Sequence, residues 1–320
     1  MKIGIFTILF DDEPLDRVLG FISQLGYEAV ELPVWRGTHH LDLDEVLKGG
    51  ATAFKKRIED HSLTISALSN HVEGQLVLGP FDGSTDVWLQ GSPDEKTSYG
   101  VKRMRRTAEA AAALDVPVVN GFIGAPNWGA WYIYPPANEQ IYEQGFMLFA
   151  EKWGAIFDFF NAHGIKFALE VHPQEQAYNI ETTRSALKAV NNNKAFGFNF
   201  DPSHFIWQLI DPVMFIKTFG ERIYHAHAKD GELVKENLSI SGCVPTGSWE
   251  RSDRGFRFRV PGWGDVPWKR VLTALAEVGY DYVLSYEHED PVMSREDGCK
   301  KCIEFLKPLV IQKRLEKVWW

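Results

Sequence analysis

The stretch FALEVHP at residues 167–173 runs through apolar residues that suit a buried strand, and then it presents Glu170 and His172. A carboxylate and an imidazole are costly to bury unless something compensates them. Three more apolar runs end in the same kind of chemistry: FNFDPSH at 198–204, HAHAKD at 225–230 and SYEHED at 285–290. This repetition predicts that four successive strands bring their last residues to one shared place.

Strand-like and helix-like segments alternate along the whole chain. The expected strands are 2–9, 28–34, 63–68, 116–122, 165–171, 195–200, 222–228 and 281–287. Helical patterns occupy 15–25, 43–60, 95–114, 139–163, 182–191, 213–219 and 266–278. Eightfold alternation predicts an α/β fold, a single (β/α)8 TIM barrel over residues 1–320. The alternative is an open doubly wound sheet, but no G-x-G-x-x-G loop follows the first strand.

Two connections are longer than the others. One is 70–93 after the third strand, and the other is 229–265 after the seventh. Long loops in a compact domain are commonly functional, and in a TIM barrel these two would rise from the catalytic face. We expect 229–265 to be a lid or an assembly insert that returns as a substrate-covering strand through RGFRFRVPGWG.

The composition excludes several classes of partner. The 320-residue chain has a formal net charge of −9 and no long cluster of lysine and arginine, which disfavours nucleic acid and anionic membranes. No stretch approaches the roughly 20 apolar residues of a membrane span. The N-terminal MKIGIFTILFDDEP suits a first strand better than a signal peptide, and only three cysteines occur, so we expect a cytoplasmic protein. Cys299 and Cys302 have C-x-x-C spacing, but they fall in a late helical pattern.

The strand ends supply a mixed set of oxygen and nitrogen ligands. Glu170, Asp201, His227 and Glu287 offer three carboxylates and one imidazole. Like charges gathered at one rim require a cation, and this set suits Mn²⁺, Mg²⁺, Co²⁺ or Zn²⁺. His225 points to the same side of its strand as His227, and we choose His227 because it lies nearer the strand end.

Each of these residues also has an ordinary structural explanation when taken alone. Asp201 precedes a proline and could cap a turn, as aspartates in that position often do. A buried histidine is often hydrogen-bonded in a core, and a strand-end glutamate often forms a surface ion pair. Their occurrence together at the ends of four successive strands favours the metal site.

These motifs resemble the sugar phosphate isomerase/epimerase family, which has the xylose-isomerase-like TIM barrel. The resemblance covers nearly the whole chain and rests on ALEVHP at 168–173, FNFDPSH at 198–204, HAHAKD at 225–230, RVPGWGDVPW at 259–268 and SYEHED at 285–290. It implies one divalent cation per chain, most often Mn²⁺, held by Glu170, Asp201, His227 and Glu287. In the ketose 3-epimerases of this family the two glutamates are also the acid and the base, which implies catalytic roles for Glu170 and Glu287.

The resemblance also implies substrate contacts. His204 of the D-x-x-H motif, and Arg259 or Arg257 before P-G-x-G, correspond to residues that contact substrate oxygens. His172 in EVHP resembles a subgroup that includes the larger subunits of C-glycoside-cleaving enzymes, which act on 3-oxo sugars, and we treat it as a catalytic candidate. The remaining substrate-binding candidates are His71 and the loop aromatics Trp128, Trp131, Tyr132 and Trp263, which could stack on a sugar.

The expected activity is that of a divalent-metal-dependent sugar isomerase or epimerase. It would abstract a proton next to the carbonyl of a keto sugar through a metal-bound enediolate. A lyase or dehydratase, or a C-glycoside-cleaving enzyme, would use the same metal and base, and a sugar-binding protein without catalysis is the alternative from another class. We expect a homo-oligomer, with a smaller partner subunit as a further expectation from the subgroup.

Overall fold

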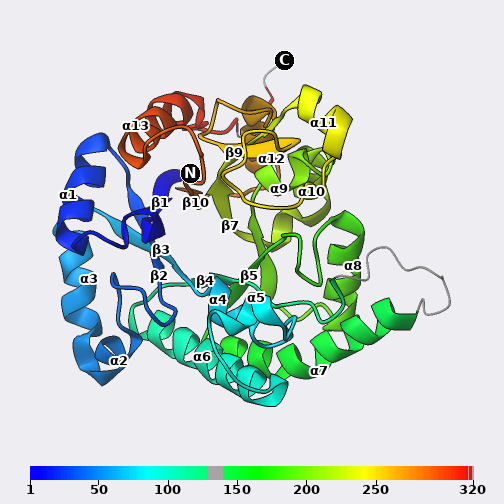
Figure 1. Ribbon diagram of the computed structural model, residues 1–320. Helices are drawn as coiled ribbons and strands as arrows, with labels where there is room; N and C mark the ends of the chain where they lie inside the picture. The colour runs from blue at the N-terminus through cyan, green and yellow to red at the C-terminus, as the bar shows by residue number, and fades with distance from the viewer. Residues whose placement is uncertain (129–139, 316, 319–320) are drawn as a thin grey trace.

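Eight parallel strands form a closed barrel at the centre of the molecule, in the order β1-β10-β7-β6-β5-β4-β3-β2 (Figure 1). The structure is a computed structural model that describes residues 1–128, 140–315 and 317–318. The barrel strands are β1 Lys2–Phe6, β2 Ala29–Pro33, β3 Thr64–Ser69, β4 Val118–Gly121, β5 Lys166–Glu170, β6 Phe196–Phe200, β7 Ile223–Ala228 and β10 Val283–Tyr286. The predicted (β/α)8 barrel is confirmed.

Helices surround the barrel, as Figure 1 shows. The longer ones are α1 Leu15–Leu25, α3 Ala51–Glu59, α6 Pro93–Ala113, α7 Gln140–Ala162, α8 Ile180–Ala189, α10 Pro212–Phe219, α12 Trp268–Glu277 and α13 Arg295–Leu306. The helix expected over 43–60 is interrupted, because Gly49 has a φ of 106°, outside the helical region. A short α2 at Leu43–Glu45 and a π-helical turn at Val46–Gly50 precede α3.

Aromatic packing fixes the position of β5 and β6 against α7. The Trp153 ring centroid lies 4.8 Å from that of Phe167 on β5, and the Phe157 centroid lies 4.9 Å from that of Phe196 on β6. All four side chains are fully buried. Aromatic pairs at these separations add stabilisation beyond the burial of their area, so the two strands that lead to the site rest on a rigid helix.

The register of the parallel strands brings their C-terminal ends to one rim. Glu170 is the last residue of β5, and Asp201 directly follows β6. His227 lies one residue before the end of β7, and Glu287 directly follows β10. The fold therefore delivers the four candidate ligands to the same end of the barrel, as the strand-end pattern predicts.

Both long connections contain regular structure. The 70–93 segment forms α4 at His71–Gln75 and α5 at Gly83–Asp86 before α6 begins. The 229–265 segment contains β8 at Asp230–Leu233, α11 at Lys235–Ser241 and β9 at Phe256–Arg259. Strands β8 and β9 pair antiparallel, with Gly231 opposite Phe258, so the expected covering strand forms one arm of a hairpin.

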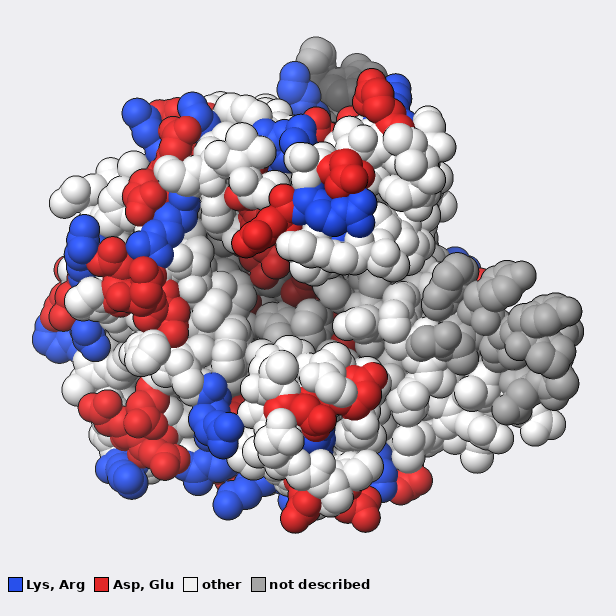
Figure 2. Space-filling view, in the orientation of Figure 1, with Lys and Arg blue, Asp and Glu red and all other residues white. Residues whose placement is uncertain are grey.

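Three further features bear on the expectations from the sequence: the surface charges, the character of the helices and the two cysteines of the C-x-x-C pair. Acidic and basic side chains are interspersed over the face in view in Figure 2. Within the described residues, no helix has the length and apolar content needed to cross a bilayer. Cys299 and Cys302 are buried free thiols on α13, consistent with the helical pattern in which they occur.

Candidate metal centre

The four residues expected to hold a cation lie together at the rim of the barrel. One ligand atom from each of Glu170, Asp201, His227 and Glu287 lies within 4.8 Å of the others. Glu170, Asp201 and His227 are buried, while Glu287 is partly buried. Figure 2 shows a hollow near the centre of the molecule with acidic side chains on its wall. The cluster therefore combines three buried ligands with Glu287, which solvent partly reaches.

The donor atoms of this cluster fit a divalent cation. Nδ1 of His227 lies 3.2 Å from an oxygen of Glu287 and 3.4 Å from an oxygen of Glu170. Within the described residues, neither His227 Nδ1 nor Asp201 Oδ2 makes a hydrogen bond, although both are buried, and Asp201 Oδ2 lies 3.1 Å from the ammonium nitrogen of Lys229. Three carboxylates and an imidazole with converging donor atoms are the ligands that Mn²⁺ and Zn²⁺ use.

His225 occupies a different place from His227. Its Nδ1 lies 3.1 Å from Oδ1 of Asn199 and 2.9 Å from Nδ2 of Asn120, and its Nε2 lies 3.3 Å from Oγ of Ser66. These partners lie deeper in the barrel than the rim. Of the two histidines between which strand alternation leaves a choice, the fold brings His227 to the three carboxylates.

Lys229 is a charged member of the cluster that sequence reasoning missed. Its Nζ lies 2.6 Å from Glu287, 3.0 Å from Glu289 and 3.1 Å from Asp201, and the residue is only 2% exposed. The signal was present in HAHAKD, where Lys229 follows His227 by two residues and therefore points to the same side of the extended chain. Its ammonium group neutralises part of the acidic charge.

The charges in the cluster shift one another's pKa values. Burial by itself would raise the pKa of Glu170, but the positive charges of His227 and Lys229 hold that pKa well below its usual range. The pKa of Glu287 is likewise lowered by Lys229 and His227 against the effect of burial. Burial raises the pKa of Asp201 to about 7, because Glu170 and Glu287 add to it and Lys229 only partly opposes it. A cation bound here would favour the ionised form of all three acids.

Three more histidines surround Glu170. Nε2 of His204, on α9 (Ser203–Ile206), lies 2.9 Å from one oxygen of Glu170, and Nε2 of His71 lies 3.0 Å from the other. The ring centroid of His172 lies 4.2 Å from that of His204. Burial lowers the pKa of His172 and lowers the pKa of His204 to about 3, so both rings are neutral at physiological pH. Neutral imidazoles beside the cluster can accept a proton.

Strand β9 contacts the cluster through a phenylalanine. The Phe258 ring lies 4.8 Å from Nζ of Lys229, and its centroid lies 5.3 Å from that of His204. Arg257 and Arg259 share the other face of β9, as alternation predicts. Both pair with Glu232, and Arg259 also pairs with Asp290 at 2.9 Å. Arg259 therefore links the hairpin to Asp290, while Phe258 is the residue of β9 that contacts Lys229 and His204.

The two loop aromatics that the structure describes, Trp128 and Trp263, are not members of the cluster of four ligands. Trp128 packs edge-on against Tyr178, with ring centroids 5.0 Å apart, and lines a pocket with Glu175 and Gln176. Trp263 is 40% exposed, and Nζ of Lys301 lies 5.5 Å from its ring. The other two predicted aromatics, Trp131 and Tyr132, lie outside the described residues.

Cation binding is expected to stabilise the fold. A cation that binds only the native chain, supplied at about 100 times its Kd, should add about 2.7 kcal/mol to the free energy of unfolding. Chelator-treated protein melted with and without Mn²⁺ or Zn²⁺ provides the measurement, and Asp201→Asn is the control, in which the increase in Tm should largely disappear. Equal melting curves with and without each cation would contradict the site.

Two known proteins are similar to this chain in sequence. The chain is 26% identical to the uncharacterised protein YfiH of Bacillus subtilis, over 98% of this chain and 100% of that one. It is also 26% identical to the inosose dehydratase of Bacillus thuringiensis, over 49% of this chain and 54% of that enzyme.

Three solved structures share the fold at low sequence identity. The probable 3-DHS dehydratase AsbF of Bacillus anthracis has a TM-score of 0.68 at 17% identity, covering 96% of this chain and 99% of that one. The IOLI protein, solved with a zinc atom, has a TM-score of 0.66 at 19% identity, covering 97% of this chain and 98% of that one. The 3-keto-D-glucoside 4-epimerase YcjR of E. coli has a TM-score of 0.66 at 14% identity, covering 96% and 99%.

A family model also matches most of the chain. The model described as "Xylose isomerase-like TIM barrel" matches residues 19–309, which include every strand of the barrel except β1. This chain belongs to the xylose isomerase-like TIM barrel family.

Proposed function

We propose that this protein is a divalent-cation-dependent sugar isomerase or epimerase that moves a proton at a carbon next to the carbonyl of a keto sugar. The observation that carries the proposal is the cluster of Glu170, Asp201, His227 and Glu287 with the neutral His172 close by. When these four side chains hold it, a divalent cation, with Mn²⁺ as our first choice, supplies positive charge that stabilises a developing oxyanion.

His172 is suited to accept the proton from carbon. Its Nδ1 contacts the carbonyl oxygen of Pro173, and a carbonyl can only accept, so Nδ1 carries the hydrogen. The lone pair of the neutral ring is then on Nε2, and this atom is the base that we assign. Glu170 and Glu287 are the other candidates for the acid and the base. They transfer protons at positions of the substrate that His172 does not reach.

His204 is suited to hold a substrate hydroxyl. A carboxylate with a low pKa accepts hydrogen bonds, so neutral His204 donates Nε2–H to Glu170. Its Nδ1 has no hydrogen-bond partner among the described residues and can accept a hydrogen bond from a sugar hydroxyl. His71, which contacts the other oxygen of Glu170, and the ring of Trp128 are the remaining proposed substrate contacts.

The second candidate function is that of a lyase or dehydratase. The observation that favours it is Lys229, a buried ammonium group 3.1 Å from Asp201 and 3.9 Å from Glu170, whose positive charge can stabilise a departing oxygen. The inosose dehydratase relative and the structural likeness to the probable 3-DHS dehydratase support this candidate. Elimination and isomerisation share the first proton abstraction, and C-glycoside cleavage on a 3-oxo sugar would share it too.

One experiment separates these functions. A panel of keto sugars and inososes is incubated with protein and Mn²⁺ in D₂O and followed by NMR. Deuterium at a carbon next to the carbonyl, with a new epimer or isomer, supports the lead proposal, whereas a new double bond with loss of water supports the lyase. Binding of a sugar without deuterium exchange in any compound would favour a sugar-binding protein.

Arg259 offers a test of the hairpin's role as a lid. Because Arg259 joins β9 to Asp290 and Glu232, Arg259→Ala should loosen the cover over the site and raise KM roughly tenfold, the equivalent of ~1.4 kcal/mol from one charged hydrogen bond. Arg257→Ala is the control, because Arg257 pairs only with Glu232 among the described ion pairs. Unchanged kinetics with a new mass in size-exclusion chromatography would instead make the hairpin an assembly contact.

A further inference from the structure

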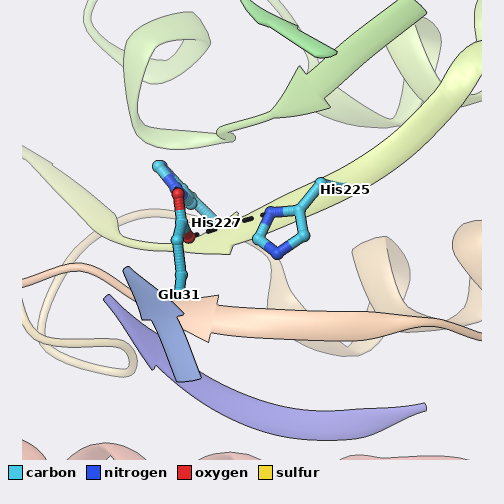
Figure 3. A group of neighbouring side chains, drawn as sticks. All are labelled: Glu31, His225 and His227. Carbon is cyan, nitrogen blue, oxygen red and sulfur yellow. Dashed lines mark hydrogen bonds and ion pairs between the residues drawn. The ribbon is translucent and has the colours of Figure 1, made fainter. Parts of the chain in front are cut away.

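Glu31 is a fully buried carboxylate inside the barrel that the proposed reaction does not use. It lies on β2, where the sequence reads AVELP, and its side chain contacts His227, which lies on β7. Its Oε2 and Oε1 lie 3.0 Å and 3.2 Å from Nε2 of His227. Figure 3 shows the Glu31 carboxylate beside the rings of both His227 and His225.

This contact determines which nitrogen of His227 keeps its proton when the other nitrogen binds a cation. An ionised carboxylate can only accept, so the hydrogen bond requires a hydrogen on Nε2. The other nitrogen, Nδ1, is the atom that faces Glu287 at 3.2 Å and Glu170 at 3.4 Å. Nδ1 is therefore the nitrogen available to a cation, and Glu31 lies on the opposite edge of the same ring.

Two neighbours hold this arrangement in place. Nδ2 of Asn120 donates to Oε1 of Glu31 at 2.8 Å and so fixes the carboxylate from β4. The ring of Phe6, on β1, stacks on His227 with centroids 6.0 Å apart and an interplanar angle of 20°. Phe6 thus limits the tilt of the imidazole, while Glu31 limits its rotation and its choice of tautomer.

We propose that Glu31 is a positioning residue that keeps the proton of His227 on Nε2 and thereby commits Nδ1 to the cation. This inference rests on the cation site of the proposed function and deepens it. Carboxylates that hydrogen-bond a metal-binding histidine orient the ring and increase its basicity as a ligand, and their loss commonly lowers metal affinity about 10–100-fold.

A second cation between Glu31, His225 and His227 is the competing explanation. Atoms of these three residues also lie within 4.8 Å of one another. However, Nε2 of His227 already makes the short contact with Glu31, and Oε1 of Glu31 already accepts from Asn120. Nδ1 of His225 faces the side chains of Asn120 and Asn199. These polar atoms thus already have protein partners. We therefore assign the Glu31 carboxylate the role of hydrogen-bond acceptor for His227, not that of a ligand for a second cation.

Glu31→Gln provides the test. The amide would either turn its N–H₂ toward Nε2–H of His227, which favours moving the ring proton to Nδ1, or present its oxygen as an uncharged and weaker acceptor, and each change weakens the ligand. We expect the Kd for Co²⁺ or Zn²⁺, measured by calorimetry, to rise about 10–100-fold. His225→Gln is the control, and it should keep the cation Kd close to wild type and a stoichiometry of one.

A spectroscopic measurement shows whether the effect passes through His227. In ¹⁵N-histidine-labelled, zinc-loaded protein, the His227 resonances are assigned by their loss in His227→Gln. We expect a proton on Nε2 and a metal-shifted Nδ1 in the wild type, and loss of this pattern in Glu31→Gln. If Glu31→Gln does not fold, Glu31→Asp, which withdraws the carboxylate by one methylene, is measured in the same way.

The outcomes distinguish the two proposals. If Asp201→Asn and His227→Gln bind the cation as the wild type does, the cation site itself fails. If those variants lose the cation while Glu31→Gln keeps both the wild-type Kd and the wild-type tautomer, only the positioning role is overturned. A stoichiometry of two cations that falls to one in His225→Gln would replace positioning with a second metal site.

Discussion

Glu287→Gln is expected to lower the affinity for a divalent cation by more than about 100-fold, because a direct ligand should matter more than its hydrogen-bonded supports. The change replaces one of the three carboxylates of the candidate ligand set with a neutral amide, a weaker ligand for a cation. Elemental analysis of protein purified without chelator, together with calorimetric titration, measures the effect.

Glu289→Gln is a matched control for this prediction. Glu289 makes the same kind of contact with Lys229, at 3.0 Å against 2.6 Å for Glu287, yet it is not one of the four clustered ligands. The side chain of Glu289 is also 47% exposed, so its loss should be tolerated. We therefore expect Glu289→Gln to retain its cation. Wild-type metal content in Glu287→Gln would remove Glu287 from the ligand set.

His172→Ala is expected to lower turnover by about 10²-fold or more while the cation content stays unchanged. The reason is that proton abstraction and cation binding are assigned to different residues. His172 packs against His204 and is not one of the four candidate ligands. The loss should appear in kcat and in the rate of deuterium exchange at carbon, because both need the free lone pair on Nε2.

The matched control for His172 is a change at a distant histidine. His163 lies at the surface just past α7, where its Nδ1 contacts the carbonyl oxygen of Phe159, and His163→Ala should leave kcat unchanged. Wild-type kcat and exchange in His172→Ala would return that histidine to a structural role. Loss of the cation together with turnover would instead mean that His172 supports the metal site.

The alternation of strands and helices could be predicted from the sequence, because each element has its own local pattern of apolar residues. α1 begins and ends at the residues that its apolar spacing indicates, Leu15 and Leu25. The helix expected over 43–60 was wrong in detail, because Gly49 departs from helical geometry in a segment whose pattern reads as one helix. The expected connection at 70–93 also contains two short helices, each of which begins after a side-chain cap, at Asn70 and at Asp82.

The gathering of the four candidate ligands could also be predicted, for a topological reason. Parallel strands of a barrel all end at one rim, so residues at successive strand ends must meet there whatever their separation in sequence. That logic applies to Glu170, Asp201, His227 and Glu287. The same reasoning predicts Lys229 at this rim, because it lies two residues after His227 and alternation points both side chains to the same side.

Only the tertiary structure decided which partners surround those ligands. AVELP contains one buried glutamate and no histidine, and nothing local indicates that Glu31 on β2 faces His227 on β7 across the closed barrel. Alternation likewise separates Phe258 from Arg259, but it does not indicate which face of β9 meets the site; that depends on how the hairpin packs over Lys229. Local sequence thus determined the strands and their reactive ends, while barrel closure and hairpin docking, which depend on contacts distant in sequence, determined the environment in which those ends act.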